Sequence, residues 1–120
     1  MTTVLFVADR QSVIDRVTAA LSGPDLDVIV HTDPETAAAT AHDLGVDRVL
    51  VDMKIGSMGA MAVTRALRAH RTGRAIPVTV LLDRAADAFL AKRAGAESWL
   101  TKDAAGADLR TLLRPTEDAA

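Results

Sequence analysis

Five apolar runs rich in β-branched residues alternate with five segments of helical spacing, and this alternation restricts the fold more than any other feature. The apolar runs cover residues 2–7, 26–31, 47–52, 76–82 and 97–101. The helical segments cover residues 11–23, 33–45, 58–71, 84–95 and 105–114. Alternation of this kind with short connections predicts a parallel sheet that is covered by helices on both faces.

Local signals support these boundaries. Asp33 and Pro34 are typical of a helix start, and Gly45 and Gly95 are typical of helix ends. The first, third and fourth apolar runs are almost uninterrupted, which predicts strands buried on both faces. The chain of 120 residues contains no linker or repeat, so we expect one domain over 1–114, a polar tail over 115–120 and no output domain.

The composition excludes several classes of function. The absence of cysteine excludes disulfides and thiolate metal sites, and the formal charge of −2 is not that of a nucleic-acid-binding chain. No apolar run approaches the roughly 20 residues needed to span a bilayer, and the N-terminus does not resemble a signal peptide. We therefore expect a cytoplasmic protein without nucleic acid, membrane insertion or a small-molecule substrate.

Charged residues follow the strands where a ligand would bind. In an open α/β sheet, ligands bind beyond the carboxyl ends of the strands, where the strand order reverses. With strand order 2-1-3-4-5, the residues that leave the strands at this edge are Asp9, Asp52, Leu82 or Asp83, and Lys102. Two carboxylates and a lysine are therefore expected to converge from distant parts of the chain.

Four short motifs at these strand ends, "VADR", "VDMK", "LLDR" and "LTKD", resemble those of the response-regulator receiver domain. The resemblance covers nearly the whole chain and implies a doubly wound (βα)5 flavodoxin-like fold. It implies that Asp52 stands at the phosphoacceptor position and Lys102 at the position of the phosphoryl-binding lysine. Asp9 matches the second member of the family's acidic pair, and Trp99 stands where the family often has an aromatic switch residue.

The sequence departs from the family pattern at several positions, including the loop after Asp52. Ala8 replaces the first acid of the pair, Leu82 replaces the hydroxyl residue after the fourth strand, and Asp103 replaces the proline after the lysine. A cis bond before a non-proline residue costs about 2.5–4 kcal/mol, so we expect a trans bond between Lys102 and Asp103.

These departures weaken the expected metal site. The resemblance implies Mg²⁺ ligands at Asp9, Asp52 and Lys54, but only two of these residues are carboxylates, and Mg²⁺ prefers oxygen ligands. If Arg10, Lys54 and Lys102 all point inward, they neutralise the site without metal. We therefore expect the protein to bind no cofactor. Mg²⁺ would be expected only if the site is functional. Asp52 is then either a phosphoacceptor or an acid paired with Lys102.

Two functions follow from the resemblance. The first is a stand-alone, atypical receiver that is not an enzyme and acts by protein–protein interaction, as a docking or accessory subunit of a larger assembly. The second is a working single-domain response regulator that a sensor histidine kinase phosphorylates on Asp52. A flavodoxin-like or phosphatase site is not expected, because "ADRQSV" has no glycine and places Gln11 where a second acid would be needed.

The residues expected to contact a partner lie on the last two helical segments and the last strand: Arg84, Asp87, Lys92, Trp99 and Arg110. A group of arginines follows helical spacing elsewhere in the chain, with Arg65, Arg68 and Arg71 three residues apart and Arg74 beyond. It is either a solvated helix face or a docking surface for an acidic partner. Phe89 is expected in the core.

Overall fold

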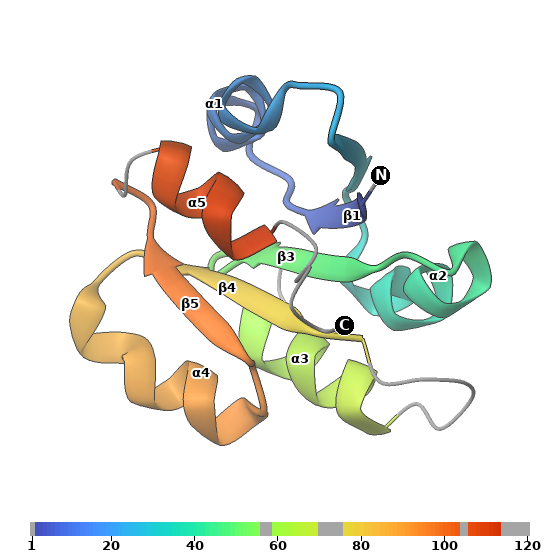
Figure 1. The fold of residues 1–120 in the computed structure, drawn as a ribbon. Helices are drawn as coiled ribbons and strands as arrows, with labels where there is room; N and C mark the ends of the chain where they lie inside the picture. Colours follow the sequence, from blue (N-terminus) through green and yellow to red (C-terminus); the bar gives the residue numbers. More distant parts are fainter. Residues whose placement is uncertain (1, 56–58, 70–75, 104–105, 114–120) are drawn as a thin grey trace, which may run out of the picture.

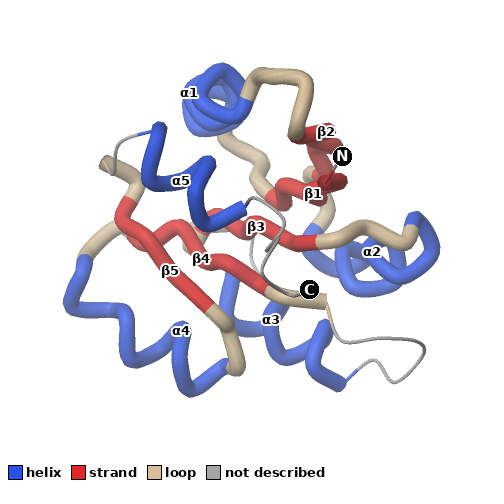
Figure 2. Tube along the Cα trace, viewed as in Figure 1, coloured by secondary structure: helices blue, strands red, loops and turns tan. Residues whose placement is uncertain are grey.

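The computed structural model describes residues 2–55, 59–69, 76–103 and 106–113. They form a five-stranded parallel sheet in the order β2-β1-β3-β4-β5, with helices on both faces (Figures 1 and 2). The strands are β1 (Thr2–Val7), β2 (Leu26–His31), β3 (Arg48–Asp52), β4 (Val78–Leu82) and β5 (Ser98–Thr101). The helices are α1 (Gln11–Leu21), α2 (Ala37–Leu44), α3 (Ala60–Ala69), α4 (Ala88–Ala94) and α5 (Gly106–Leu113). The predicted fold class and strand order are confirmed.

The core consists of two apolar layers, one on each face of the sheet. Successive residues of a strand point to opposite faces. In β3, Val49 and Val51 therefore enter the layer that α2, α3 and α4 cover, whereas Leu50 enters the layer that α1 and α5 cover. Burial on both faces explains why β1, β3 and β4 carry almost continuous apolar runs.

Two predicted helices begin with a tighter turn than expected. Residues 34–36 and 85–87 form 3₁₀ turns, and the α-helices start only at Ala37 and Ala88. The Asp33 carboxylate accepts a hydrogen bond from the backbone N–H of Glu35 at 3.0 Å, with Pro34 between them. This local bond satisfies an N-terminal amide and favours a tight first turn.

Both helices end at the predicted glycines. Gly45 and Gly95 have φ angles of +64° and +100°, a region that residues with a Cβ atom avoid. The chain leaves each helix there and enters β3 and β5.

The prediction that Phe89 lies in the core is wrong. Phe89 is 57% exposed, because the buried face of α4 consists of Ala91 and Ala94, three residues apart. Phe89 precedes Ala91 by two residues, which places it about 200° around the helix from that face. The spacing in the short segment did not reveal which face of the helix was buried.

Arg68 of the predicted basic group does not belong to a solvated face. Its guanidinium donates to the carbonyl oxygen of Ile76 at 2.6 Å and to the carboxylate of Glu97 at 2.8 Å. Glu97 also accepts from the backbone N–H of Val78 at 2.9 Å. Arg68 therefore joins α3 to the starts of β4 and β5. Arg65 is exposed, and Arg71 and Arg74 lie outside the described residues.

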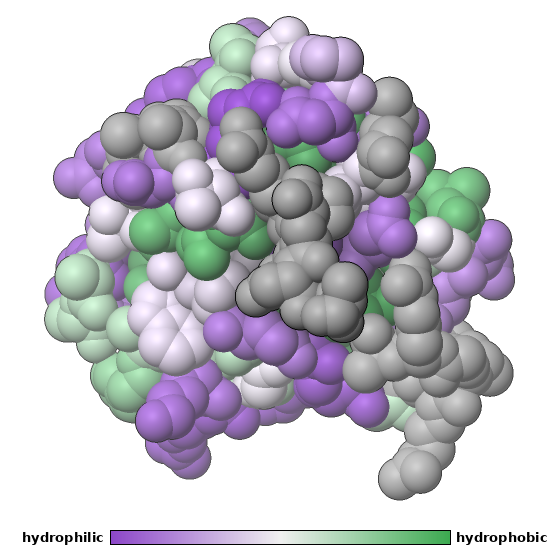
Figure 3. All heavy atoms as spheres, viewed as in Figure 1, coloured by the Kyte–Doolittle hydropathy of each residue, from purple (hydrophilic) through white to green (hydrophobic). Residues whose placement is uncertain are grey.

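Figure 3 shows hydrophilic and apolar residues intermingled over one face of the molecule. No helix in the described ranges is both long enough and apolar enough to cross a membrane.

Candidate functional site

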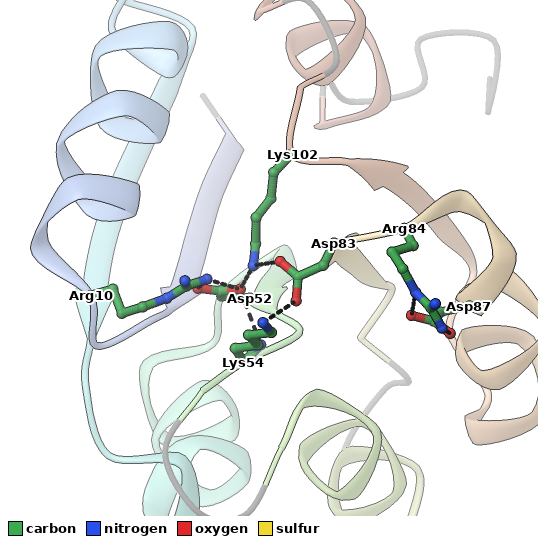
Figure 4. A network of polar contacts seen from close by, with 7 residues as sticks. All are labelled: Arg10, Asp52, Lys54, Asp83, Arg84, Asp87 and Lys102. Carbon is green, nitrogen blue, oxygen red and sulfur yellow. Dashed lines mark hydrogen bonds and ion pairs between the residues drawn. The ribbon is translucent and has the colours of Figure 1, made fainter.

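The carboxyl ends of four strands bring the candidate residues to one edge of the sheet. Asp52 is the last residue of β3, while Asp83 and Lys102 directly follow β4 and β5. The backbone N–H of Lys102 donates to the carbonyl oxygen of Leu82 at 2.9 Å, which continues the β4–β5 pairing past the strands. Arg10 arrives from the turn between β1 and α1 and points toward Asp52 (Figure 4).

Asp52 is completely buried, and donors contact both of its carboxylate oxygens. Oδ1 lies 2.5 Å from the ammonium of Lys102 and accepts the backbone N–H of Lys54 at 3.1 Å. Oδ2 lies 3.2 Å from the guanidinium of Arg10. A buried carboxylate is stable only when it is paired and hydrogen-bonded, and Asp52 meets both conditions.

Lys102 connects two carboxylates. Its ammonium contacts Asp52 and also Asp83 Oδ1, and its side chain is only 11% exposed. The other oxygen of Asp83, Oδ2, lies 3.7 Å from the ammonium of Lys54. Arg10, Asp52, Lys102, Asp83 and Lys54 thus form a line of alternating charge, in which three cations share two carboxylates (Figure 4).

This network changes the acidity of Asp83. Burial alone would raise the pKa of Asp83, but the hydrogen bond and charge of Lys102, aided by Lys54 and Arg10, lower it below the ordinary value of 3.8. The Asp83 carboxyl is therefore ionised at neutral pH and forms an ion pair with Lys102.

Asp83 was not predicted as a site residue, although the sequence placed it at a strand end. The family pattern directs attention to Leu82, and the side chain of Leu82 is buried in the layer beneath α3 and α4. The following residue is the one whose side chain reaches Lys102. An acid directly after an apolar run was the only available signal.

The residues do not fit a Mg²⁺ site. Ala8 is buried and offers no carboxylate, Asp9 is exposed, and cations contact both oxygens of Asp52. Lys54 presents an ammonium to Asp83 and a backbone N–H to Asp52, so only its backbone carbonyl oxygen could ligate a cation. Within the described part of the chain, no three His, Cys, Asp or Glu side chains gather in one place.

The peptide bond that follows Lys102 has the predicted geometry. The Lys102–Asp103 peptide bond is trans, as expected. Asp103 is exposed and accepts a hydrogen bond from the hydroxyl of Thr101 at 2.5 Å, so its carboxylate is held toward the end of β5.

The residues expected to contact a partner occupy two different places. Arg84 and Asp87 pair at 3.1 Å, turned away from the charged network (Figure 4), and this pairing raises the pKa of Arg84. Lys92 is exposed on α4, and Trp99 of β5 is partly buried against the layer beneath that helix.

Arg110 instead faces α1. Its guanidinium donates to the carbonyl oxygen of Ser22 at 2.9 Å and contacts the carboxylate of Asp25. Arg110 thus links α5 to the turn that leads into β2. Its guanidinium is paired with a carboxylate of the same chain.

The family model described as the response regulator receiver domain matches residues 4–114. The sensory transduction protein RegX3 of Mycobacterium tuberculosis is 31% identical over 114 residues, which make up 95% of this chain and 50% of RegX3. The chain thus spans about half the length of the curated relatives it matches.

Solved structures show the same relationship. The BeF3-activated receiver domain of RstA from Klebsiella pneumoniae is 27% identical, with a TM-score of 0.80 over 93% of this chain and 95% of that one. The receiver domain of the sensor histidine kinase PA1611 from Pseudomonas aeruginosa, which has a magnesium ion coordinated in its active-site cleft, is 26% identical, with a TM-score of 0.75 over 93% of each chain. The chain belongs to the response regulator receiver domain family, the signalling modules of two-component systems.

Proposed function

We propose that this receiver domain acts by binding another protein, as a docking or accessory subunit of a larger assembly, without a normal phosphorylation switch. The pairing of the buried Asp52 carboxylate with Lys102 and Arg10 carries the proposal. Phosphoryl transfer needs an attacking carboxylate oxygen and cations that neutralise the incoming phosphoryl group. Here both oxygens already accept fixed donors, and the residues do not form a Mg²⁺ site.

A second observation supports the loss of the switch. A ligand shifts a conformational equilibrium only when it prefers one of the two states. In the family, a hydroxyl after the fourth strand contacts the phosphoryl group and couples it to the signalling face. Leu82 stands at that position with its side chain in the core, and it has no group that could donate a hydrogen bond.

The alternative is a working response regulator in which a sensor histidine kinase phosphorylates Asp52. The positions of Asp52 and Lys102 at the strand ends favour it, as does the similarity to the BeF3-activated RstA receiver. In this case Arg10 and Lys102 would have to release Asp52 before the reaction.

Intact mass spectrometry separates these functions. The protein is incubated with Mg²⁺ and acetyl phosphate, in parallel with the Asp52→Asn variant and with a receiver domain known to accept phosphate. We expect no phosphoryl adduct on this chain while the reference receiver is modified. An adduct that is lost in Asp52→Asn would establish the alternative.

We place the partner surface on the exposed side of α4, which carries Phe89 and Lys92, and on the adjoining segment 84–87 and strand β5, which carry Arg84, Asp87 and Trp99. Exposed aromatic side chains are frequent anchors of protein interfaces, and Phe89 is 57% exposed. Leu44, 54% exposed at the end of α2, offers a matched control. Phe89→Ser should abolish co-purification of the native partner, whereas Leu44→Ser should retain it. Equal capture by both variants would contradict this surface.

A further inference from the structure

We propose that Asp83 is an internal anion that competes with an incoming oxyanion for Lys102 and so keeps phosphate-like ligands away from Asp52. The proposal rests on the proposed function, because it names the group that regulates access to the same site. Asp83 contacts Lys102 through one carboxylate oxygen and lies 3.7 Å from Lys54 through the other.

The ammonium of Lys102 already serves two anions. It carries three N–H donors, and it contacts two carboxylates, those of Asp52 and Asp83. An oxyanion arriving beside Asp52 would need this ammonium to hold its charge. It would have to displace Asp83 or share Lys102 with it.

The position of Asp83 is suited to this role. Its side chain is 25% exposed, whereas that of Lys102 is 11% exposed and Asp52 is fully buried. Asp83 is therefore the more exposed of the two carboxylates that contact Lys102. Because like charges repel, its carboxylate opposes such an anion even where no contact forms.

The surroundings would accept an anion once Asp83 is neutral. Without the charge of Asp83, the network would hold one carboxylate, that of Asp52. Its three cationic groups, on Arg10, Lys54 and Lys102, would remain. A tetrahedral oxyanion of the phosphate class matches the resulting excess of positive charge.

The test is a titration with inorganic phosphate at constant ionic strength, followed by the ¹H–¹⁵N NMR shifts of the Lys54 and Lys102 amides. The protein is compared with Asp83→Asn and Asp83→Ser, which remove the charge in two ways in case one variant folds poorly. Asp43→Asn is the matched control, because Asp43 is exposed near the end of α2, just before β3 begins at the opposite edge of the sheet.

We expect both Asp83 variants to bind phosphate at least tenfold more tightly than the parent chain, and Asp43→Asn to stay within twofold of it. Equal affinities in all forms, or binding to none of them, would overturn the proposal. The result is independent of the mass-spectrometric test. Phosphorylation of Asp52 would overturn the proposed function even if Asp83 lowers the affinity for phosphate. Equal phosphate affinities would overturn the role of Asp83 even if Asp52 is never phosphorylated.

Discussion

The ammonium of Lys102 lies 2.5 Å from the carboxylate of Asp52, and no part of Asp52 is exposed to solvent. The two residues are 50 positions apart and meet because β3 and β5 lie on either side of β4. Their pairing makes this edge of the sheet a structural element as well as a candidate reactive site.

Removing the charge of Lys102 should therefore destabilise the fold. Lys102→Met leaves Asp52 buried with Arg10 as its remaining charged partner, and breaking a buried pair typically costs 3–5 kcal/mol. We expect a loss of about 3 kcal/mol in the free energy of unfolding, measured with urea. Lys102→Met combined with Asp52→Asn should recover most of this loss, because no uncompensated buried charge remains. Equal losses in the single and double variants would show that the pair does not stabilise the fold.

Asp83 should make the stability depend on pH in the acid range. Its pKa is lower in the folded chain than the ordinary 3.8, so the folded state favours the ionised carboxylate. The resulting stabilisation is present above about pH 4 and is lost as the pH falls through the lowered pKa. We expect the urea midpoint of the parent chain to fall more steeply below pH 4 than that of Asp83→Asn. Parallel curves for the two proteins would rule out this contribution.

The glycine at the end of α4 should be harder to replace than the one at the end of α2. Both have positive φ, which costs roughly 1–2 kcal/mol with a Cβ atom. At Gly95 the new Cβ would also lie 2.9 Å from Cγ of Arg68, whereas at Gly45 nothing lies within 4 Å. Gly95→Ala should therefore lose about 1 kcal/mol more unfolding free energy than Gly45→Ala. Similar thermal and urea stabilities would contradict the steric argument.

Arg68 should contribute more to stability than its neighbour Arg65. Arg68→Met keeps an unbranched apolar stem but removes the guanidinium and with it the bonds to the Ile76 carbonyl and the Glu97 carboxylate. Hydrogen bonds to charged groups contribute about 1.5–3 kcal/mol, and partial exposure of Arg68 favours the lower part of that range. We expect a loss of about 2 kcal/mol by urea unfolding. Arg65→Met should change stability by less than about 0.5 kcal/mol, as exposed substitutions do, and a similar loss in both variants would refute the role of Arg68.

The strands and the glycine-terminated helix ends could be predicted from the sequence because they depend on local patterns. The bounds of β1 and β2 agree with the predicted runs, and β3 begins one residue later than expected. Gly45 and Gly95 end their helices because the backbone at those points needs positive φ, which is a local requirement. The error at Phe89 arose because a segment of seven helical residues with several alanines has no strong apolar face.

At the candidate site, local sequence determined which charged residues stand at the strand ends, including Asp52 and Lys102. Only the tertiary structure decided how they pair. The burial of Leu82 leaves Asp83 as the residue that reaches Lys102, and the turn before β2 binds Arg110 through Asp25, 85 positions away. Such pairings depend on where separate strand and helix ends meet and on how far each charge is removed from water, and neither quantity is a property of a short stretch of chain.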